Sequence, residues 1–397
     1  MKKTTLYNLI ATFFITMGVS SCADFLDQEN PAYDAEGFYA TEAGLKEGVT
    51  GIYPLLYFDM NWAVPACIVL DHYTAYGLEQ DENSSIGAGG TLNPDNGKIQ
   101  AFWTGEYQIA ARANSVIYGA KDAVAGMSDA ARQYYAEARV LRAYAYYNLI
   151  SAFGDVPFFT APVTIDEYKV GRTPKGEIID FLIKDLNDAA DYLPWTAAQR
   201  GRVDKAVAYG LIARIGLFGG SFNVENKAAE YFSIAADAAS KVIGKRKLAP
   251  KFSDLFNLTG QAKSEVRDEL LWELMYSTNG TKKLHTVGYG HSSRNYASSV
   301  RFPSSLIVDT YECIDGKRID ESPLYDPKQP TLNRDPRFNA TLAGHGDTIN
   351  YTITDGNNPQ KLILNIYDDK TRFYPRRNAW YTAPNVDVTS TSPSLVN

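Results

Sequence analysis

The sequence is poor in the two residue types that most often hold metal ions, with 3 cysteines and 4 histidines among 397 residues. It contains no Cys-x-x-Cys pair and no His-Glu-x-x-His arrangement, the spacings typical of zinc sites. Cys67 and Cys313 stand far apart, so a disulfide between them and two buried free thiols are both open alternatives. We predict neither a metal nor another cofactor.

Recognisable catalytic motifs are also lacking. The sequence has no P-loop and no Gly-x-Ser-x-Gly nucleophile elbow. Gly288-Tyr289-Gly290 lacks the third glycine and the preceding strand of a dinucleotide-binding loop. The paired carboxylates of a glycoside hydrolase remain an open alternative, because their signature is a separation in space that a sequence does not show. We expect a protein that is not an enzyme.

Positive charge is scarce, since 39 Lys and Arg residues stand against 46 Asp and Glu residues, giving a net charge of −7. This balance argues against a nucleic-acid partner and against an electrostatic hold on anionic lipid. Beyond the N-terminus, no apolar run approaches the length that spans a membrane.

The N-terminus itself carries an export signal. Two lysines follow the first methionine, an apolar run covers residues 6–19, and Ser20 and Ser21 precede Cys22. This order is typical of a secretory signal, and a cysteine at the cut site is typical of a bacterial lipoprotein. We predict that residues 1–21 are removed and that Cys22 carries the lipid anchor. Several acyl chains hold a protein to a membrane because each buried methylene contributes roughly 0.8 kcal/mol.

Helical periodicity dominates the rest of the chain. Thr41 stands at the cap position of a helix whose apolar face carries Leu45 and Val49. Stronger apolar stripes cover about 99–117 and 128–153, the second ended by Gly154. Further helices are predicted over about 175–193, 204–218 (closed by Gly219-Gly220), 226–243 and 304–312, and the segment 269–274 is either a strand or a buried turn of helix. The fold class is therefore mainly α, with a few short strands in the second half.

The helices over 128–243 pair into two hairpins with a repeat-like spacing. Gly154 and Gly219, which we expect to end equivalent helices, lie 65 residues apart (219 − 154). Two tetratricopeptide units would span about 68 residues. We therefore predict a scaffold of tetratricopeptide-like hairpins over about 38–245, followed by a loop-rich region over about 246–397; a non-repetitive helical domain is the alternative.

Several segments resemble the SusD/RagB family of outer-membrane nutrient-binding lipoproteins. The resemblance rests first on the start of the mature chain, Cys22-Ala23-Asp24-Phe25-Leu26-Asp27. Its most specific motif is Glu137-Ala138-Arg139-Val140-Leu141-Arg142-Ala143-Tyr144, running on to Phe153-Gly154-Asp155-Val156-Pro157, and Asn333-Arg334-Asp335-Pro336-Arg337 matches as well. The residues themselves favour structural roles for these motifs: Arg139 and Arg142 in ion pairs between helices, Asp335 as a helix cap and Trp103 in the core.

The resemblance implies a helical, tetratricopeptide-like scaffold whose loops bind oligosaccharide or polysaccharide. It further implies a lipid-anchored protein of the cell outer membrane, exposed at the surface, that passes glycan to a SusC-like TonB-dependent transporter. Family members normally continue well past the Arg-Asp-Pro-Arg segment, so we expect a shortened or divergent member. A relative that binds peptides or other nutrients, and a protein–protein adaptor, are the alternatives.

Two long loops are the candidate glycan-binding segments, because sugar rings pack on aromatic planes and their hydroxyls bind amides, carboxylates and arginine. The chain is rich in tyrosine, with 27 residues of this type. The candidate ligand-binding residues are Trp62, then Tyr73, Tyr76, Asp81 and Asn83 in the loop over 72–98, and Tyr289, Arg294, Asn295 and Tyr296 in the loop over 277–301.

Overall fold

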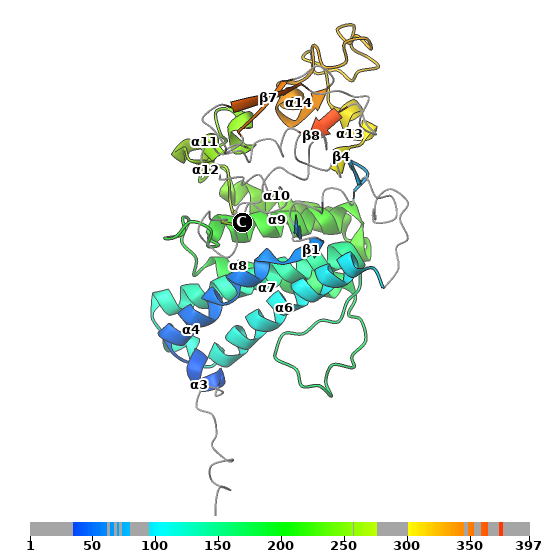
Figure 1. Cartoon of the computed structure of the whole chain (residues 1–397). Coiled ribbons are helices and arrows are strands. Elements are labelled where there is room, and N and C mark those ends of the chain that lie inside the picture. The colour runs from blue at the N-terminus through cyan, green and yellow to red at the C-terminus, as the bar shows by residue number, and fades with distance from the viewer. Residues whose placement is uncertain are drawn as a thin grey trace, which may run out of the picture.

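The structure is a computed structural model that describes residues 35–61, 64–66, 70, 74–79, 95–256, 258–275, 301–344, 348–352, 359–363 and 373–375. It is mainly helical, as predicted (Figure 1). The longer helices are α4 (Glu42–Thr50), α6 (Gly97–Ala120), α7 (Asp129–Phe153), α8 (Lys175–Ala190), α9 (Lys205–Ser221) and α10 (Ala228–Val242). Short helical segments are α3 (Ala35–Tyr39), η2 (Tyr53–Tyr57), η4 (Val124–Gly126), η5 (Val224–Asn226), η6 (Phe252–Phe256), α11 (Leu258–Gln261), α12 (Ser264–Arg267), α13 (Ser305–Thr310) and α14 (Pro336–Thr341).

Side-chain caps fix where several of the long helices begin. Thr41 accepts a hydrogen bond from Gly44 N ahead of α4, as the sequence predicts, and Ser128 accepts one from Ala131 N ahead of α7. Asp204 accepts from two backbone N–H groups at the start of α9. These oxygens satisfy donors that have no partner inside the helix. Gly154 ends α7 with a φ of 73°, a conformation that favours glycine.

The helices α6 to α10 pack each against the next, and α7 also contacts α9. The predicted pairing of α7 with α8 and of α9 with α10 is therefore observed. The predicted end of α9 is wrong, because the helix continues through Gly219 and Gly220 to Ser221. A Cβ at Gly219 would lie 2.8 Å from a ring atom of Tyr231 on α10. These glycines allow two helices to approach closely and do not terminate one.

A buried ion-pair cluster joins α6, α7 and α8. Arg142 donates to Asp185 Oδ2 over 2.7 Å and to Asn114 Oδ1 over 3.1 Å, and Arg139 donates to Asp185 Oδ1 over 2.7 Å. Buried charges are tolerated when they are paired and hydrogen-bonded in this way. The predicted structural role of both arginines is confirmed. Trp103 is half-buried against the core, with its ring edge-on to Phe153 at 4.9 Å.

Strands are short and form two-stranded antiparallel ladders. Short strands lie in the second half of the chain, as predicted, and others lie in the first half. The ladders pair β1 (Asp59–Asn61) with β2 (Val64–Pro65), β3 (Gly77–Glu79) with β4 (Arg301–Pro303), β5 (Leu342–Gly344) with β8 (Phe373–Pro375), and β6 (Thr348–Thr352) with β7 (Pro359–Ile363). The segment 269–274 is neither strand nor helix. Its Trp272 Nε1 donates to Gly201 O over 2.9 Å, so contacts with the scaffold replace a backbone ladder.

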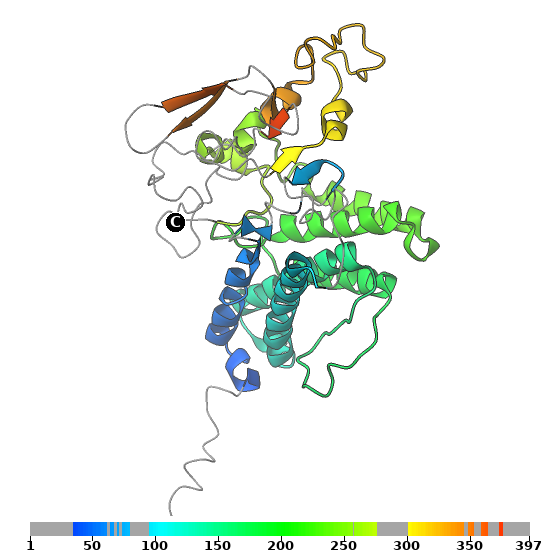
Figure 2. The same ribbon diagram turned by 45° about the vertical axis from the view of Figure 1, so that its right-hand side comes forward.

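The described helices and strands after residue 250 gather on the side of α9 and α10 that faces away from α6 and α7 (Figures 1 and 2). In this region α13 is shorter than the predicted helix over 304–312. Asp335 caps α14 and Pro336 occupies its first turn, as predicted. Within the described residues, no helix combines the length and the apolar character that crossing a bilayer requires.

Candidate functional site

The ladder between β3 and β4 brings together two parts of the chain that are more than two hundred residues apart in sequence. Gly77 pairs with Pro303 and Leu78 with Phe302. Next to this ladder, Ser304 N donates to Tyr76 O over 2.8 Å and Ser304 Oγ donates to Ala75 O over 2.6 Å. The segment Gly77–Glu79 of the first predicted binding loop therefore lies beside Arg301, where the second predicted binding loop ends.

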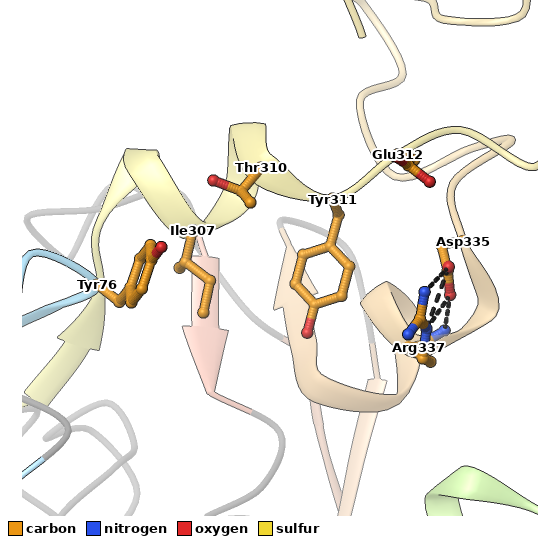
Figure 3. Close-up of a pocket in the computed structure, with 7 residues that line it drawn as sticks. All are labelled: Tyr76, Ile307, Thr310, Tyr311, Glu312, Asp335 and Arg337. Carbon is orange, nitrogen blue, oxygen red and sulfur yellow. Dashed lines mark hydrogen bonds and ion pairs between the residues drawn. The ribbon is translucent and has the colours of Figure 1, made fainter. Parts of the chain in front are cut away.

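A pocket of about 380 Å³ opens beside this ladder (Figure 3). It lies between the turn that carries Tyr76, α13 with the residues that follow it, and the start of α14. Its lining residues are Tyr76, Ile307, Thr310, Tyr311, Glu312, Asp335 and Arg337. Figure 3 shows Tyr76 at one end and the Asp335–Arg337 pair at the other, with Ile307 and Tyr311 between them.

Tyr311 is held in the pocket wall from behind. Its ring meets the ring of buried Phe338 edge-on, with 5.5 Å between the centroids. The guanidinium of Arg334 lies over the ring of Phe338, 4.4 Å from its centroid. Arg334 Nη2 donates to Val308 O over 2.6 Å and to Tyr311 O over 2.8 Å. Because helix C-terminal carbonyls lack partners inside the helix, this arginine fixes the end of α13 and the position of Tyr311.

Asp335 and Arg337 form an ion pair that closes one end of the pocket. Arg337 Nε donates to Asp335 Oδ1 over 3.0 Å, and Arg337 Nη2 donates to Asp335 Oδ2 over 2.6 Å. Asp335 Oδ1 also accepts from the Arg337 backbone N–H over 2.8 Å. The hydrogen bond from the Arg337 side chain lowers the pKa of the Asp335 carboxyl, so this carboxyl stays ionised at neutral pH.

The lining combines flat apolar surface with oxygen atoms that accept hydrogen bonds. Tyr76 leaves 47% of its surface exposed, and Tyr311 is half-buried. Thr310 Oγ1 donates to Leu306 O over 2.7 Å, so its oxygen remains available as an acceptor. The exposed Glu312 supplies a carboxylate. A sugar ring, with an apolar C–H face and outward hydroxyls, is the type of ligand that such a wall can bind.

Of the ligand-binding residues predicted from the sequence, Tyr76 is in the described part of the chain and lines this pocket. The others lie outside the described residues: Trp62, Tyr73, Asp81, Asn83, Tyr289, Arg294, Asn295 and Tyr296, and so does the predicted lipid-anchor residue Cys22. Cys313 is a buried free thiol, and Cys67 is outside the described residues.

The sequence reasoning did not select Tyr311, Glu312 or Arg337. Tyr311 and Glu312 follow directly on α13. An aromatic residue next to an acidic one at a helix end was a pattern that could have indicated sugar binding. Arg337 was assigned only to a structural motif. Within the described residues, no group of three or more His, Cys, Asp or Glu side chains is arranged to hold a metal ion.

Two family models match this chain. One, described as "Starch-binding associating with outer membrane", matches residues 24–217, and the other, described as "SusD family", matches residues 268–393. The chain belongs to the SusD/RagB family. The resemblance drawn from the sequence motifs is confirmed.

The curated relatives that this SusD-family chain matches are named SusD or SusD-like proteins. It is 27% identical over 310 residues to SusD-like protein P2 of Formosa agariphila, covering 73% of this chain and 56% of that protein. It is 31% identical over 179 residues to the starch-binding protein SusD of Bacteroides thetaiotaomicron, covering 43% of this chain and 30% of that protein. The chain spans about half the length of the curated relatives it matches, at 56% and 52% for the first two.

The fold is similar to that of a solved SusD-like carbohydrate-binding protein from Bacteroides fragilis. The TM-score is 0.63 at 22% identity, and the match covers 78% of this chain and 61% of that one. The predicted mainly helical, tetratricopeptide-like architecture of the family is thereby confirmed. Apart from Tyr76, the residues that line the pocket come from the part of the chain after residue 300.

Proposed function

We propose that this SusD-family protein binds glycan without transforming it, and that the pocket between Tyr76, α13 and α14 is part of its glycan-binding site. The observation that carries the proposal is the placement of two tyrosines in one pocket, with Tyr76 at one end and Tyr311 toward Glu312 and the Asp335–Arg337 pair. The aromatic planes provide the stacking surface, and the carboxylates accept hydrogen bonds from sugar hydroxyls.

The architecture around the pocket supports this role. Tyr311 is fixed by Phe338 and Arg334, so little side-chain freedom is lost when a ligand packs against it. Tyr76 is fixed through its backbone by Ser304. The relatives named for starch or carbohydrate binding are consistent with a sugar as the ligand. The candidate residues outside the described part of the chain, which are Trp62 and those in the two loops, remain proposed contacts.

We further propose that the protein is anchored at the outer membrane through Cys22, exposed at the cell surface, and hands glycan to a SusC-like TonB-dependent transporter. The lipoprotein-type signal ahead of Cys22 supports the anchor. The family description that names association with the outer membrane supports the location.

The test of the glycan site is affinity electrophoresis and titration calorimetry of purified protein against a panel of soluble polysaccharides. Tyr76→Ala should weaken binding of a retained polysaccharide at least tenfold, which is about 1.4 kcal/mol, because the stacking plane is removed. The matched control is Tyr192→Ala, since Tyr192 has a similar exposed fraction, 49% against 47%, but follows α8 on the scaffold. Equal retention of the Tyr76→Ala and native proteins would contradict the proposal, provided that Tyr192→Ala also binds normally.

A further inference from the structure

The positively charged side chain of the pocket already forms an ion pair with a neighbouring carboxylate. Among the described residues that line the pocket, Arg337 is the only positively charged one. Its Nε–Nη2 edge, one of the two edges by which a guanidinium binds a carboxylate or sulfate in bidentate fashion, is occupied by Asp335 over 3.0 and 2.6 Å. A ligand anion would compete with Asp335 for this edge or meet a guanidinium whose charge Asp335 already balances, and the position of Asp335 is also fixed by the backbone N–H at the start of α14.

A second carboxylate gives the described lining of the pocket a net negative charge. Glu312 is exposed on the pocket wall and forms no ion pair with any described residue. Its charge contributes to the raised pKa of Arg337, although the main cause of that rise is the hydrogen bond with Asp335. With Asp335 and Arg337 cancelling each other, Glu312 leaves one uncompensated negative charge beside the space where a ligand would lie. Like charges at close range repel, whereas sugar hydroxyls donate readily to a carboxylate.

We infer, resting on the proposed glycan-binding function, that this pocket selects uncharged sugar rings and rejects uronic and sulfated ones, with Asp335 and Glu312 as the residues that determine this specificity. Asp335 acts by keeping the guanidinium of Arg337 occupied, and Glu312 acts by repelling the anion directly. Rejection of the wrong ligand class by an unfavourable charge is a common basis of specificity.

The experiment measures native protein and the double variant Asp335→Asn/Glu312→Gln by affinity electrophoresis and calorimetry. The neutral probes are soluble starch, xyloglucan and galactomannan, and the anionic probes are polygalacturonate, alginate and chondroitin sulfate. Asparagine caps a helix about as well as aspartate, and the surface ion pair that is lost contributes little to stability. The double variant should therefore fold like the native protein, which circular dichroism and thermal melting verify.

A matched control separates the pocket from the overall charge. Asp320 pairs with Arg318 two residues away, as Asp335 pairs with Arg337, but Asp320 and Arg318 do not line the pocket. The control variant is Asp320→Asn/Glu321→Gln, which removes the same two charges from the neighbouring exposed turn.

We expect the native protein to bind at least one neutral probe and none of the anionic ones at the same ionic strength. The pocket double variant should gain at least tenfold in affinity for an anionic probe, and the control variant should not. Comparable native affinity for neutral and anionic probes would overturn the inference, and so would a double variant that gains nothing. Failure of the native protein to bind any probe would instead count against the proposed function, so the two failures are distinguishable.

Discussion

Glu106 is a buried acid whose ionisation should reduce the stability of the scaffold as the pH rises. It lies on α6 with 1% of its surface exposed. Asn148 Nδ2 donates to its Oε1 over 2.8 Å, and its Oε2 has no hydrogen-bond partner among the described residues. Burial raises the pKa of this carboxyl from 4.5 to about 8, against the smaller opposing effect of the Asn148 hydrogen bond. The group is therefore mostly neutral in the folded protein at neutral pH.

The sign of the pH effect follows from the raised pKa. Below the unfolded-state value both states hold the proton, and the contribution of Glu106 to stability is fully present. As the pH rises toward the folded-state value the unfolded chain releases a proton that the folded chain keeps, so the free energy of unfolding falls by about 1.4 kcal/mol per pH unit. The accumulated loss is on the order of 3 kcal/mol at about pH 7, and it levels off near about 5 kcal/mol above about pH 8.

Glu106→Gln tests this reasoning because glutamine resembles the protonated acid. Its Oε1 can accept from Asn148, and its amide nitrogen replaces the oxygen that lacks a partner. Urea denaturation of the variant and the native protein, followed by circular dichroism between about pH 5 and about pH 9, gives the difference in free energy of unfolding. The two proteins should agree within about 1 kcal/mol at the acidic end, and the variant should be more stable by several kcal/mol at the alkaline end.

The control for this comparison is Glu47→Gln, which removes a carboxylate from the exposed face of α4. Its difference from the native protein should stay small at every pH, because an exposed charge on a helix surface contributes little. A difference between Glu106→Gln and the native protein that stays constant across the whole pH range would refute the assignment of Glu106 as a buried neutral acid.

Two further predictions concern the scaffold and the anchor. Leu141→Ala should lower the free energy of unfolding by roughly 2–5 kcal/mol, because Leu141 is 0% exposed and the truncation leaves a cavity. Leu217→Ala, at a side chain 55% exposed, is the control in the same urea titration. A loss below about 1 kcal/mol for Leu141→Ala would contradict the assignment of Leu141 to the core. Cys22→Ala should leave the precursor uncleaved and without acyl label in cells fed labelled palmitate. Normal labelling of that variant would place the anchor elsewhere.

The helices were predictable because their evidence is local. The stripe that includes Leu141 and Leu149, the cap Ser128 and the terminator Gly154 all lie within one segment, and each agrees with the others. The end of α9 was not predictable in the same way, since a glycine that terminates a helix and a glycine that lets a neighbouring helix approach have the same appearance in sequence. The ring of Tyr231 on α10 decides between them, and that contact is tertiary.

The pocket was only partly predictable for a related reason. Tyr76 was selected because its loop was long, polar and aromatic, and it does line the pocket. Tyr311 and Arg337 come from other segments. The β3–β4 ladder brings the start of α13 beside Tyr76, and the contact of Tyr311 with Phe338 joins α13 to α14. Periodicity reports which face of a helix is buried, but it does not report which distant turn lies beside that face.

The segment from Arg334 to Arg337 shows why a structural and a binding interpretation of one motif need not compete. Arg334 binds the last carbonyls of α13 and thereby places Tyr311, while Asp335 caps α14 and holds the Arg337 side chain at the pocket wall. Arg334 determines the geometry of the aromatic surface, and Asp335 balances the charge of the Arg337 guanidinium beside it. A change at Arg334 should therefore alter affinity for all sugars alike, whereas a change at Asp335 should alter which sugars are accepted. That difference follows from what each side chain contacts.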